Sequence, residues 1–528
     1  MSKPKTFVRE ATGLVKEISA FRSFLVSLFF IAPALVLLWI PVGQAIFPSA
    51  NLFISIALAL PATLIMAFIY AQFAIAYPRS GGEYIFIGKT FSPSIGFMCN
   101  FVTTLILVSS SAVFAVYVSS FGLGPMFATL GSLLGNTALS SLATAFTTPL
   151  SEFLIAVITL VILNFIVALG TSTTFKLKTA LFIITYIGVF SFIIVFGLMS
   201  RNYFISNFDK FSSVSYSQVI SLAQESGASL SFSWSDTIGA VVYTILAVLG
   251  FVGSSYVAGE VKNPKVSQLV GNVGSLLFYL IIMVIVLIVT YKTIGHAFLG
   301  AIGYLALTGN SKYPIPAPLP ILTSIAGYGS GNGYLEVIWG VSIIATLFGV
   351  IIALTFAATR NIFAWSFDAI LPRKIAEVNE KYHSPHYSLL VITIMELLFI
   401  YLTIFTPATA YLTYDVTGTF AILAFMGVAG ILLPFRRKET FESAPSIVNK
   451  KLGRTPLIVI VGVAAIIDGI IIAYETTSPK ISGPLNPTYL GMTALFFVVG
   501  YIIYWASYGI QKRRGIPVDI IHKEIPPE

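Results

Sequence analysis

The sequence predicts an all-α membrane protein with twelve transmembrane helices. Of the 528 residues, 57% are hydrophobic and only 10% are charged, whereas an ordinary soluble domain has about 25% charged residues. A hydrocarbon core of about 30 Å requires about 20 apolar residues per helix. Twelve long apolar runs meet this requirement, and they lack the period-two alternation of a transmembrane β-barrel. The predicted spans are residues 23–47, 52–77, 95–121, 153–170, 179–200, 237–258, 269–291, 337–359, 388–408, 416–435, 455–474 and 488–510.

The lysines and arginines predict which ends of these spans face the cytoplasm. With the N-terminus inside, 25 of the 30 basic residues fall in cytoplasmic segments and 5 fall outside. A shift of one helix would destroy this asymmetry, which is the one that the positive-inside rule describes. We therefore expect a multi-pass protein of the cell membrane with both termini in the cytoplasm. The net charge of +9 follows from the same rule and gives no reason to expect a nucleic-acid partner.

Outside the spans, the chain offers little that could fold by itself. Residues 1–22 form a basic cytoplasmic segment without the apolar core of a cleaved signal peptide, and their apolar positions predict a short interfacial helix. Residues 23–510 form the transmembrane domain, and residues 511–528 a cytoplasmic tail. The segment 122–151 has no charged residue and is expected to be an outer loop.

Two of the predicted spans contain residues that interrupt a helix. Pro33 lies in the middle of the first span, where proline removes a backbone hydrogen bond and costs about 3 kcal/mol. Gly250 and Gly253 lie in the sixth, and glycine is about 1 kcal/mol less favourable than alanine in a helix. The interrupted stretches are Ile31, Ala32, Pro33 and Ala34 in the first span, and Leu249, Gly250, Phe251, Val252, Gly253 and Ser254 in the sixth. Interrupted helices at corresponding positions of two halves indicate the central site of a transporter, although a kink or close packing would also explain them.

The two breaks would offer a bound ligand groups of opposite partial charge. The first span runs outward, so the helix beginning after Ala34 would direct free amides and a partial positive charge at a carboxylate. The sixth runs inward, so the helix ending near Leu249 would offer carbonyl groups to an ammonium group. Ser110 and Thr419, from the third and tenth spans, are expected to face the side chain of the ligand. Serine in a membrane helix also commonly mediates contacts between helices.

Three cytoplasmic segments resemble motifs of the amino acid–polyamine–organocation (APC) permeases. They are YPRSGGEYIFIGKTFSPSIGF (77–97), AGEVKNPK (258–265) and ATRNIFAWSFDAILPRKIAEVNEKYHSPHYS (358–388). They follow the second, sixth and eighth spans, as they do in that family, and the tail RRGIPVDIIHKEIPPE is similar to its C-termini. The chain departs from the family at Val252, where many members have an acid, and at Gly259, where they have a second glutamate before Glu260.

The resemblance implies the fold associated with the leucine transporter. Helices 1–5 (about 23–200) and 6–10 (about 237–435) would form inverted repeats with broken helices 1 and 6. Helices 11 and 12 (about 455–510) would be peripheral. The motifs would form a cytoplasmic gate, and Arg79 could pair there with Glu83, Glu260 or Asp368. The candidate gate residues are Arg79, Gly81, Gly82, Glu260, Lys262 and Asp368.

The coupling ion stays open at this point. Some members of the family use a lysine midway along helix 5 as a proton site; the register places Thr185 there and Lys178 nearer the cytoplasm. Sodium would instead use carbonyls of the first break and a hydroxyl such as Thr346, and uncoupled exchange requires neither. Glu396 and Asp468 lie inside spans, where a charge costs about 2.5–3.5 kcal/mol, and we interpret them as paired or protonated structural acids.

The predicted function is secondary active transport of amino acids across the membrane by alternating access. Its partners would be a small amino acid or amine and the lipid bilayer; the oligomeric state is not predicted. The alternative is a transporter or exchanger of polyamines, other organic amines or nucleobases. The sequence has no filter motif, which disfavours a channel, and no large soluble signalling domain, which disfavours a receptor. It also shows no set of catalytic residues, which disfavours an enzyme. The single cysteine, Cys99, cannot form an internal disulfide, and no cofactor or metal is expected beyond a coupling ion, H⁺ or Na⁺.

Overall fold

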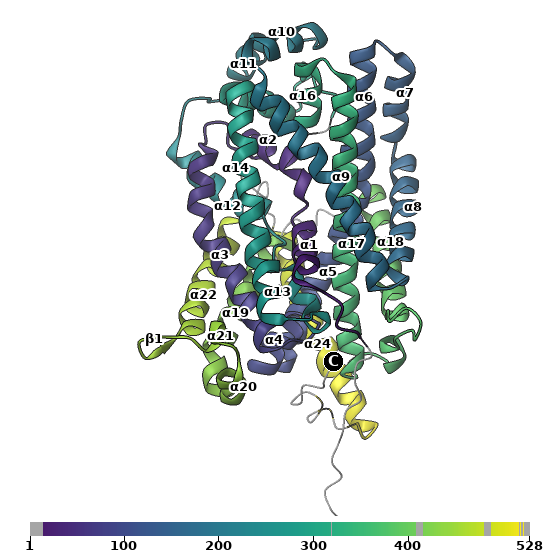
Figure 1. Cartoon of the computed structure of the whole chain (residues 1–528), viewed down its shortest axis with the longest axis vertical. Coiled ribbons are helices and arrows are strands. Elements are labelled where there is room, and N and C mark those ends of the chain that lie inside the picture. The colour runs from purple at the N-terminus through teal and green to yellow at the C-terminus, as the bar shows by residue number, and fades with distance from the viewer. Residues whose placement is uncertain are drawn as a thin grey trace, which may run out of the picture.

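The computed structural model describes residues 14–317, 319–407, 415–479, 487–516, 518 and 521. Within them the chain forms a bundle of long helices that run between the two ends of the molecule (Figure 1). Among the described residues, ten helices are long and apolar enough to span a membrane, or eleven spans if one bent pair of helices counts as one. This confirms an all-helical membrane protein, with only a short hairpin of β1 (Lys451–Leu452) and β2 (Thr455–Pro456) as sheet among the described residues.

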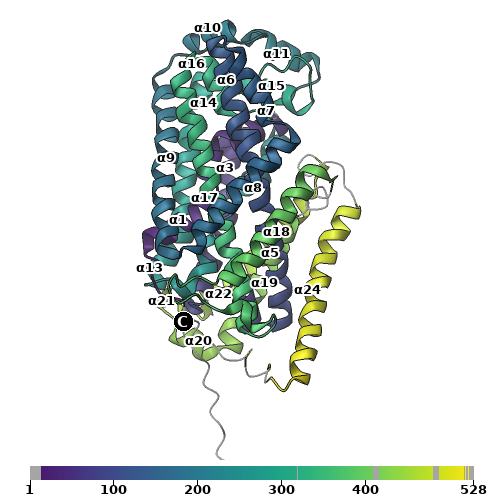
Figure 2. The same cartoon turned by 90° about the vertical axis from the view of Figure 1, so that its right-hand side faces the viewer.

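Most of the spans follow the predicted ones closely. The uninterrupted helices are α3 (Leu52–Ala76), α8 (Pro149–Ala168), α9 (Thr171–Leu198), α17 (Gly333–Phe367), α18 (His386–Phe405), α19 (Asp415–Arg436), α22 (Leu457–Glu475) and α24 (Pro487–Arg513). The seventh span begins with α13 (Pro264–Gln268), passes through a π-helical turn, η4 (Leu269–Gly274), and continues as α14 (Ser275–Thr293). Figure 2 shows α24 at the edge of the bundle.

The first predicted span is a bent pair of helices, as Pro33 indicated. α1 (Ala20–Phe30) and the helical stretch Pro33–Ile46 meet at 42°. Pro33 opens a 3-10 turn, η1 (Pro33–Leu35), that leads into α2 (Val36–Ile46). Ala32, just before it, has a φ of 62° in the left-handed region, where a side chain is unfavourable. Such strain persists only where the surrounding structure enforces it.

The sixth predicted span also divides into two pieces. α12 (Trp234–Ala247) ends before the glycines, and a 3-10 helix, η3 (Gly253–Glu260), follows after five residues. Gly250 has a φ of +117°, and a Cβ atom there would lie 2.5 Å from the carbonyl oxygen of Phe30. The break in this span therefore packs directly against the backbone of the break in the first.

The third predicted span is longer than expected, and most of the segment 122–151, which was expected to be an outer loop, is helical. α5 (Pro93–Tyr117) continues through a π-helical turn, η2 (Val118–Leu123), into α6 (Gly124–Leu134), and α7 (Thr137–Phe146) follows. α6 packs in the bundle, where Met126 and Leu130 are buried, whereas Ala143 is the only buried residue of α7.

Shorter helices cover both ends of the bundle. α10 (Arg201–Phe211), α11 (Tyr216–Glu225), α15 (His296–Leu307) and α16 (Leu322–Ser330) follow predicted outer ends of spans. α4 (Glu83–Thr90), η5 (Arg373–Ala376), α20 (Lys438–Ser443) and α21 (Ser446–Asn449) follow predicted cytoplasmic ends. α10 and α11 lie at the top of Figure 1 and α4 and α20 at its bottom, so we call these the upper and lower ends.

The N-terminal segment differs from the predicted interfacial helix. Residues 14–19 are not helical, and residues 1–13 lie outside the described part of the chain. Ile18 instead forms a parallel bridge with Val261: its N–H donates to the Glu260 carbonyl (2.9 Å), and its carbonyl accepts from the Lys262 N–H (3.0 Å). These tertiary hydrogen bonds replace those that a helix would have supplied.

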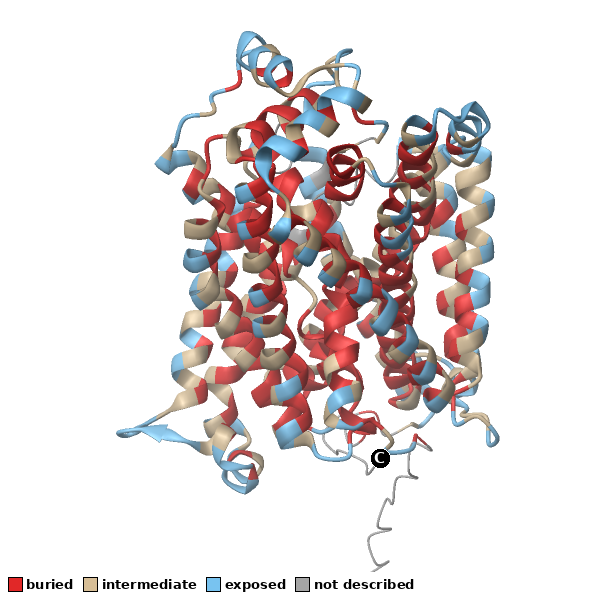
Figure 3. Cartoon of the chain, turned by 45° about the horizontal axis from the view of Figure 1, so that its top comes forward, coloured by how far each residue is buried: buried red, intermediate tan, exposed pale blue. Residues whose placement is uncertain are grey.

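Burial is concentrated along the middle of the bundle (Figure 3). α17 is enclosed along most of its length, with Trp339, Arg360 and Asn361 at most 1% exposed. Large apolar side chains such as Phe165 on α8 and Ile194 on α9 are exposed. Exposed apolar surface of this kind fits a protein whose surroundings are lipid.

Candidate functional site

A cavity of about 250 Å³ lies in the middle of the bundle against both helix breaks. One water requires only about 10–15 Å³ of such space, so the cavity has room for a considerably larger molecule. Its lining is mostly apolar, with a few hydroxyl groups and one carboxyl group. The lining residues are Phe30, Ile31, Trp39, Met66, Tyr70, Glu83, Thr103, Ile106, Leu107, Ser110, Phe114, Leu246, Ala247, Leu249, Gly250, Val252, Tyr256, Leu354, Thr419 and Ile422.

About half of the predicted binding residues line this cavity. They are Ile31 from the first break, Leu249, Gly250 and Val252 from the second, and Ser110 and Thr419 from α5 and α19. The others lie behind it: Ala32, Pro33, Ala34, Phe251, Gly253 and Ser254 are buried in the surrounding helices.

The backbone amide groups from Ile31 to Leu35 at the first break are all hydrogen-bonded within the protein, apart from Pro33, which has no N–H. The Ala34 N–H donates to the hydroxyl of Thr346 on α17 (3.2 Å), and the Leu35 N–H donates to the Ala32 carbonyl (2.9 Å). The Thr346 hydroxyl also lies 3.1 Å from that of Thr185 on α9. The two predicted ion-coupling residues thus meet beside the first break.

Ser254 connects helices rather than lining the cavity. Its N–H donates to the Ser27 hydroxyl (2.9 Å), and its own hydroxyl donates to Asn272 (2.7 Å) and Gln268 (2.9 Å). These contacts tie α1, η3 and the start of the seventh span together.

Lys178 on α9 lies closer to the first break than its place in the sequence indicated. Its side chain is 1% exposed, and its ammonium nitrogen lies 5.8 Å from the centre of the Phe29 ring and 5.6 Å from that of Phe175. Phe29 is in the last turn of α1, directly before the break. Among the described residues, the structure gives Lys178 these ring contacts and neither an ion pair nor a hydrogen bond.

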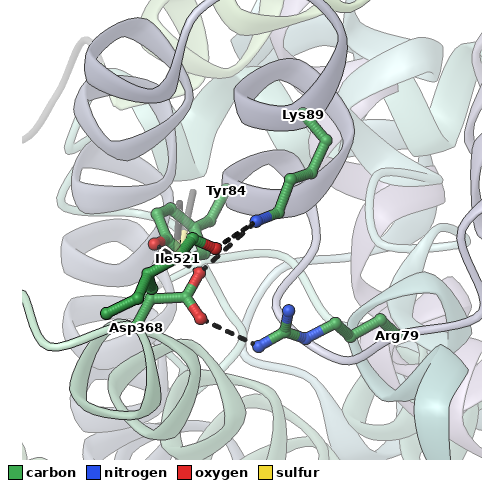
Figure 4. Close-up of polar contacts among 5 residues, drawn as sticks. All are labelled: Arg79, Tyr84, Lys89, Asp368 and Ile521. Carbon is green, nitrogen blue, oxygen red and sulfur yellow. Dashed lines mark hydrogen bonds and ion pairs between the residues drawn. The ribbon is translucent and has the colours of Figure 1, made fainter. Parts of the chain in front are cut away.

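At the lower end, the first and third motifs meet at Asp368 (Figure 4). Arg79 donates to one carboxylate oxygen at 3.0 Å; Tyr84 donates to the other at 2.9 Å, and the Lys89 nitrogen lies 3.8 Å from it. All four side chains are at most 5% exposed. Burial raises the pKa of Tyr84 well above its ordinary value, which keeps this phenol a hydrogen-bond donor. The sequence left Glu83, Glu260 and Asp368 as possible partners of Arg79, and in the structure Arg79 forms its ion pair with Asp368.

The second and third motifs meet in a further buried ion pair. Arg360 Nε lies 2.8 Å from Glu260 Oε1, and Nη2 lies 3.0 Å from Oε2, which is the bidentate arrangement. Both side chains are 1% exposed, and the Thr171 hydroxyl donates to Oε2 at 3.2 Å. The candidate gate residues predicted from the sequence include Glu260 but not Arg360.

The glycines of the first motif allow it to contact η3. The Gly81 N–H donates to the Tyr256 carbonyl (3.2 Å), and a Cβ atom at Gly82 would lie 2.5 Å from the Tyr256 ring. Both glycines have positive φ values. Lys262, in contrast, is exposed and joins neither of the two buried ion pairs.

Sequence reasoning missed Glu83 as a cavity residue. Its carboxyl group accepts hydrogen bonds from Tyr70 (2.7 Å), Tyr256 (2.6 Å) and Asn100 (3.0 Å). The available signal was its position: Glu83 follows two glycines, which allow a sharp turn back toward the membrane.

The other two acids predicted inside spans, Glu396 and Asp468, do not line the central cavity. Glu396 is fully buried and accepts from Thr355 (2.6 Å) and Asn164 (2.7 Å), whereas Asp468 lies on α22, away from the cavity lining. Within the described residues, no group of three or more His, Cys, Asp or Glu side chains is placed to hold a metal ion.

Comparison with known proteins identifies the family. A model of a family described as amino acid permease matches residues 18–505. The chain is also similar to the branched-chain amino acid permease BcaP of Bacillus subtilis (strain 168), with 24% identity over 343 residues. That match covers 65% of each chain, which is just under two thirds of the relative's length. Because the family model covers most of the sequence and extends from the N-terminal bridge to the last helix, the chain belongs to the amino acid permease family of the APC superfamily, a family of transporters and not of enzymes.

Proposed function

We propose that this protein is a secondary active transporter that moves amino acids across the cell membrane by alternating access. The observation that carries the proposal is the central cavity at the point where two interrupted helices touch. Membrane-embedded backbone is tolerated in a non-helical form where it is buried in protein or lines a cavity. The contact of Gly250 with the Phe30–Ile31 peptide supplies such a place.

We also propose the twelve-span architecture with both termini in the cytoplasm. Counting the bent first pair as one span and α12 with η3 as another gives twelve. The first helix of each five-helix half, about 23–200 and 237–435, is then the interrupted one. This correspondence supports inverted repeats, with α22 and α24 as the two additional helices.

The lining of the cavity favours an amino acid with an aliphatic side chain. Leu107, Leu246, Leu354 and Ile422 are among its many apolar groups. The similar protein from Bacillus subtilis is described as a branched-chain amino acid permease, which points to the same class. Backbone groups at the breaks would hold the carboxylate and the ammonium group, and leucine, isoleucine and valine are the first candidates.

The two buried ion pairs at the lower end are proposed to form the cytoplasmic gate. Arg79–Asp368 and Arg360–Glu260 connect all three motifs, and both are almost inaccessible to water. Opening a path from the cavity to the cytoplasm would require these elements to separate. Because Ile18 is hydrogen-bonded on both sides of Val261, the N-terminal segment would move with them.

Of the coupling schemes, the structure favours protons. Among the described residues, Lys178 is buried beside the last turn of α1 with ring contacts and no ion pair, and a buried ammonium group without a counter-ion is costly. Binding and release of a proton there would respond to movement of α1. The hydroxyls of Thr346 and Thr185 are already bonded to Ala34 and to each other, which disfavours them as sodium ligands.

A thermal-shift screen of the purified chain tests the substrate class. We expect stabilisation by leucine, isoleucine or valine, because a ligand that binds only the folded state raises the melting temperature. Polyamines and nucleobases are the comparison ligands. Stabilisation by those ligands alone would contradict amino acid transport and support the alternative class.

A further inference from the structure

The central cavity contains one acidic group that the two helix breaks do not explain. Glu83 is the first residue of α4 and is 1% exposed, yet it lines the cavity together with Gly250 and Val252. α4 lies at the lower end of the bundle (Figure 1). The cavity therefore extends from the helix breaks to a carboxyl group on the side of the ion pairs.

The hydrogen bonds around Glu83 fit an ionised carboxylate. Tyr70 and Tyr256 donate to Oε1 at 2.7 and 2.6 Å, and Asn100 donates to Oε2 at 3.0 Å. A carboxylate accepts at about four lone-pair sites and has nothing to donate. Three donors from three different elements are consistent with this form, and they leave the carboxylate able to accept one more hydrogen bond.

Glu83 differs from the other buried acids of the lower end. Asp368 is paired with Arg79, and Glu260 is paired with Arg360. Glu83 has only neutral donors, and no ion pair joins it to a basic residue in the part of the chain that the structure describes. The described lining residues include no lysine, arginine or histidine. Among the described residues, no ion pair therefore neutralises the Glu83 carboxylate.

We propose that Glu83 binds the ammonium group of the transported amino acid. A primary ammonium group supplies the missing positive charge and a donor for the remaining acceptor site, and a hydrogen bond between charged groups is about twice as strong as a neutral one. Backbone carbonyls at the second break can orient the same group, but they carry no net charge. This inference rests on the proposed function and names the side chain that recognises the substrate.

Binding to the purified full-length chain tests this role with two probes, L-leucine and 4-methylpentanoate, which is leucine without its ammonium group. Glu83→Gln should weaken leucine binding at least about tenfold, because it removes a charge-assisted hydrogen bond. It should leave the affinity for 4-methylpentanoate unchanged or higher. Glu83→Asp, which keeps the charge, should retain part of the preference for leucine.

Glu396→Gln is the matched control, since it also removes a buried carboxylate from a hydrogen-bonded site but lies outside the cavity lining. It should leave the affinities for both probes unchanged. Equal leucine affinity in the wild type and Glu83→Gln would overturn the role of Glu83. Failure of the wild-type chain to bind leucine or any other amino acid would instead contradict the proposed function.

A measurement on the wild-type chain keeps the inference testable if Glu83→Gln does not fold. Leucinol keeps the ammonium group of leucine and lacks the carboxylate. We expect leucinol to compete with labelled L-leucine, and 4-methylpentanoate to compete at least about tenfold more weakly. The opposite order would overturn recognition of the ammonium group by an acidic side chain.

Discussion

Replacing Arg360 with methionine should open the cytoplasmic side of the protein. The change removes two charge-assisted hydrogen bonds, at 2.8 and 3.0 Å, from the buried Glu260 carboxylate. Among the described residues, the Thr171 hydroxyl is then the one remaining donor to this side chain. Removing one partner of a buried ion pair costs about 3–5 kcal/mol. This cost is relieved in any conformation in which Glu260 reaches water.

The expected shift in population is therefore large. Every 1.4 kcal/mol is a factor of about ten in an equilibrium constant. If the pair separates completely when the gate opens, the ratio of open to closed molecules should rise by about 100-fold or more. Replacing both residues, as in Glu260→Leu with Arg360→Met, removes both charges and should restore much of the closed state.

Thiol accessibility measures this ratio. Cys99 is the only cysteine of the chain, so Cys99→Ala provides a background in which Ala258→Cys is the single thiol. Ala258 is fully buried in η3 beside the gate. Its rate of modification by an impermeant maleimide, added from the cytoplasmic side, should rise at least about tenfold in Arg360→Met.

The control is an ion pair at the surface. Lys438 and Glu442 lie 3.8 Å apart with side chains 73% and 62% exposed, and such a pair is worth about 0–1 kcal/mol. Glu442→Gln should leave the modification rate unchanged. An unchanged rate in folded Arg360→Met protein would refute the assignment of Arg360 and Glu260 to the gate.

Three further predictions concern other parts of the bundle. Gly82→Ala should lower the melting temperature and the uptake rate, because its Cβ atom would meet the Tyr256 ring at 2.5 Å. Gly135→Ala is the control: Gly135 has a similar φ of +60° but open space around it, so this variant measures the effect of backbone strain without the clash. Lys178→Ala should abolish uptake driven by a pH gradient while leaving exchange against internal amino acid, and a sodium gradient that drives wild-type uptake would contradict proton coupling. Glu396→Gln should cost about 1–3 kcal/mol of stability by leaving one buried donor unpaired, with little change in uptake per folded molecule; a large loss of transport at unchanged stability would show that Glu396 takes part in coupling.

Hydropathy and the helix-interrupting residues proline and glycine predicted the spans well. Both signals depend only on residues that are close together in the sequence. Long apolar runs must be helical in a bilayer, and Pro33 and Gly250 mark the interruptions that the structure shows at those positions. The third span, in contrast, was predicted to end at residue 121, where the chain passes through a π-helical turn and continues as a helix. Packing in the bundle compensates there for the low helix propensity of glycine.

Pairing between distant residues could not be predicted in the same way. Arg79 had three acids within reach of its motif, and only the fold brings Asp368 to it from 289 positions away. In the sequence, Arg360 was one of the basic residues that predicted the cytoplasmic side. Only the structure shows that α17 brings it into an ion pair with Glu260. A single sequence does not show which side chains share a buried site. The position of Glu83 in the lining of the central cavity could therefore be recognised only from the structure.

Uptake of labelled L-leucine into liposomes containing the purified chain tests the central claim most directly. We expect uptake by the wild type and its loss in Gly250→Leu, because a side chain at Gly250 would collide with the Phe30–Ile31 peptide where the two interrupted helices meet. Gly491→Leu is the matched control: Gly491 lies on α24, a Cβ atom there would have no described atom within 4 Å, and this variant should transport normally. Undiminished uptake by correctly inserted Gly250→Leu protein would contradict a substrate site at the contact of the two breaks.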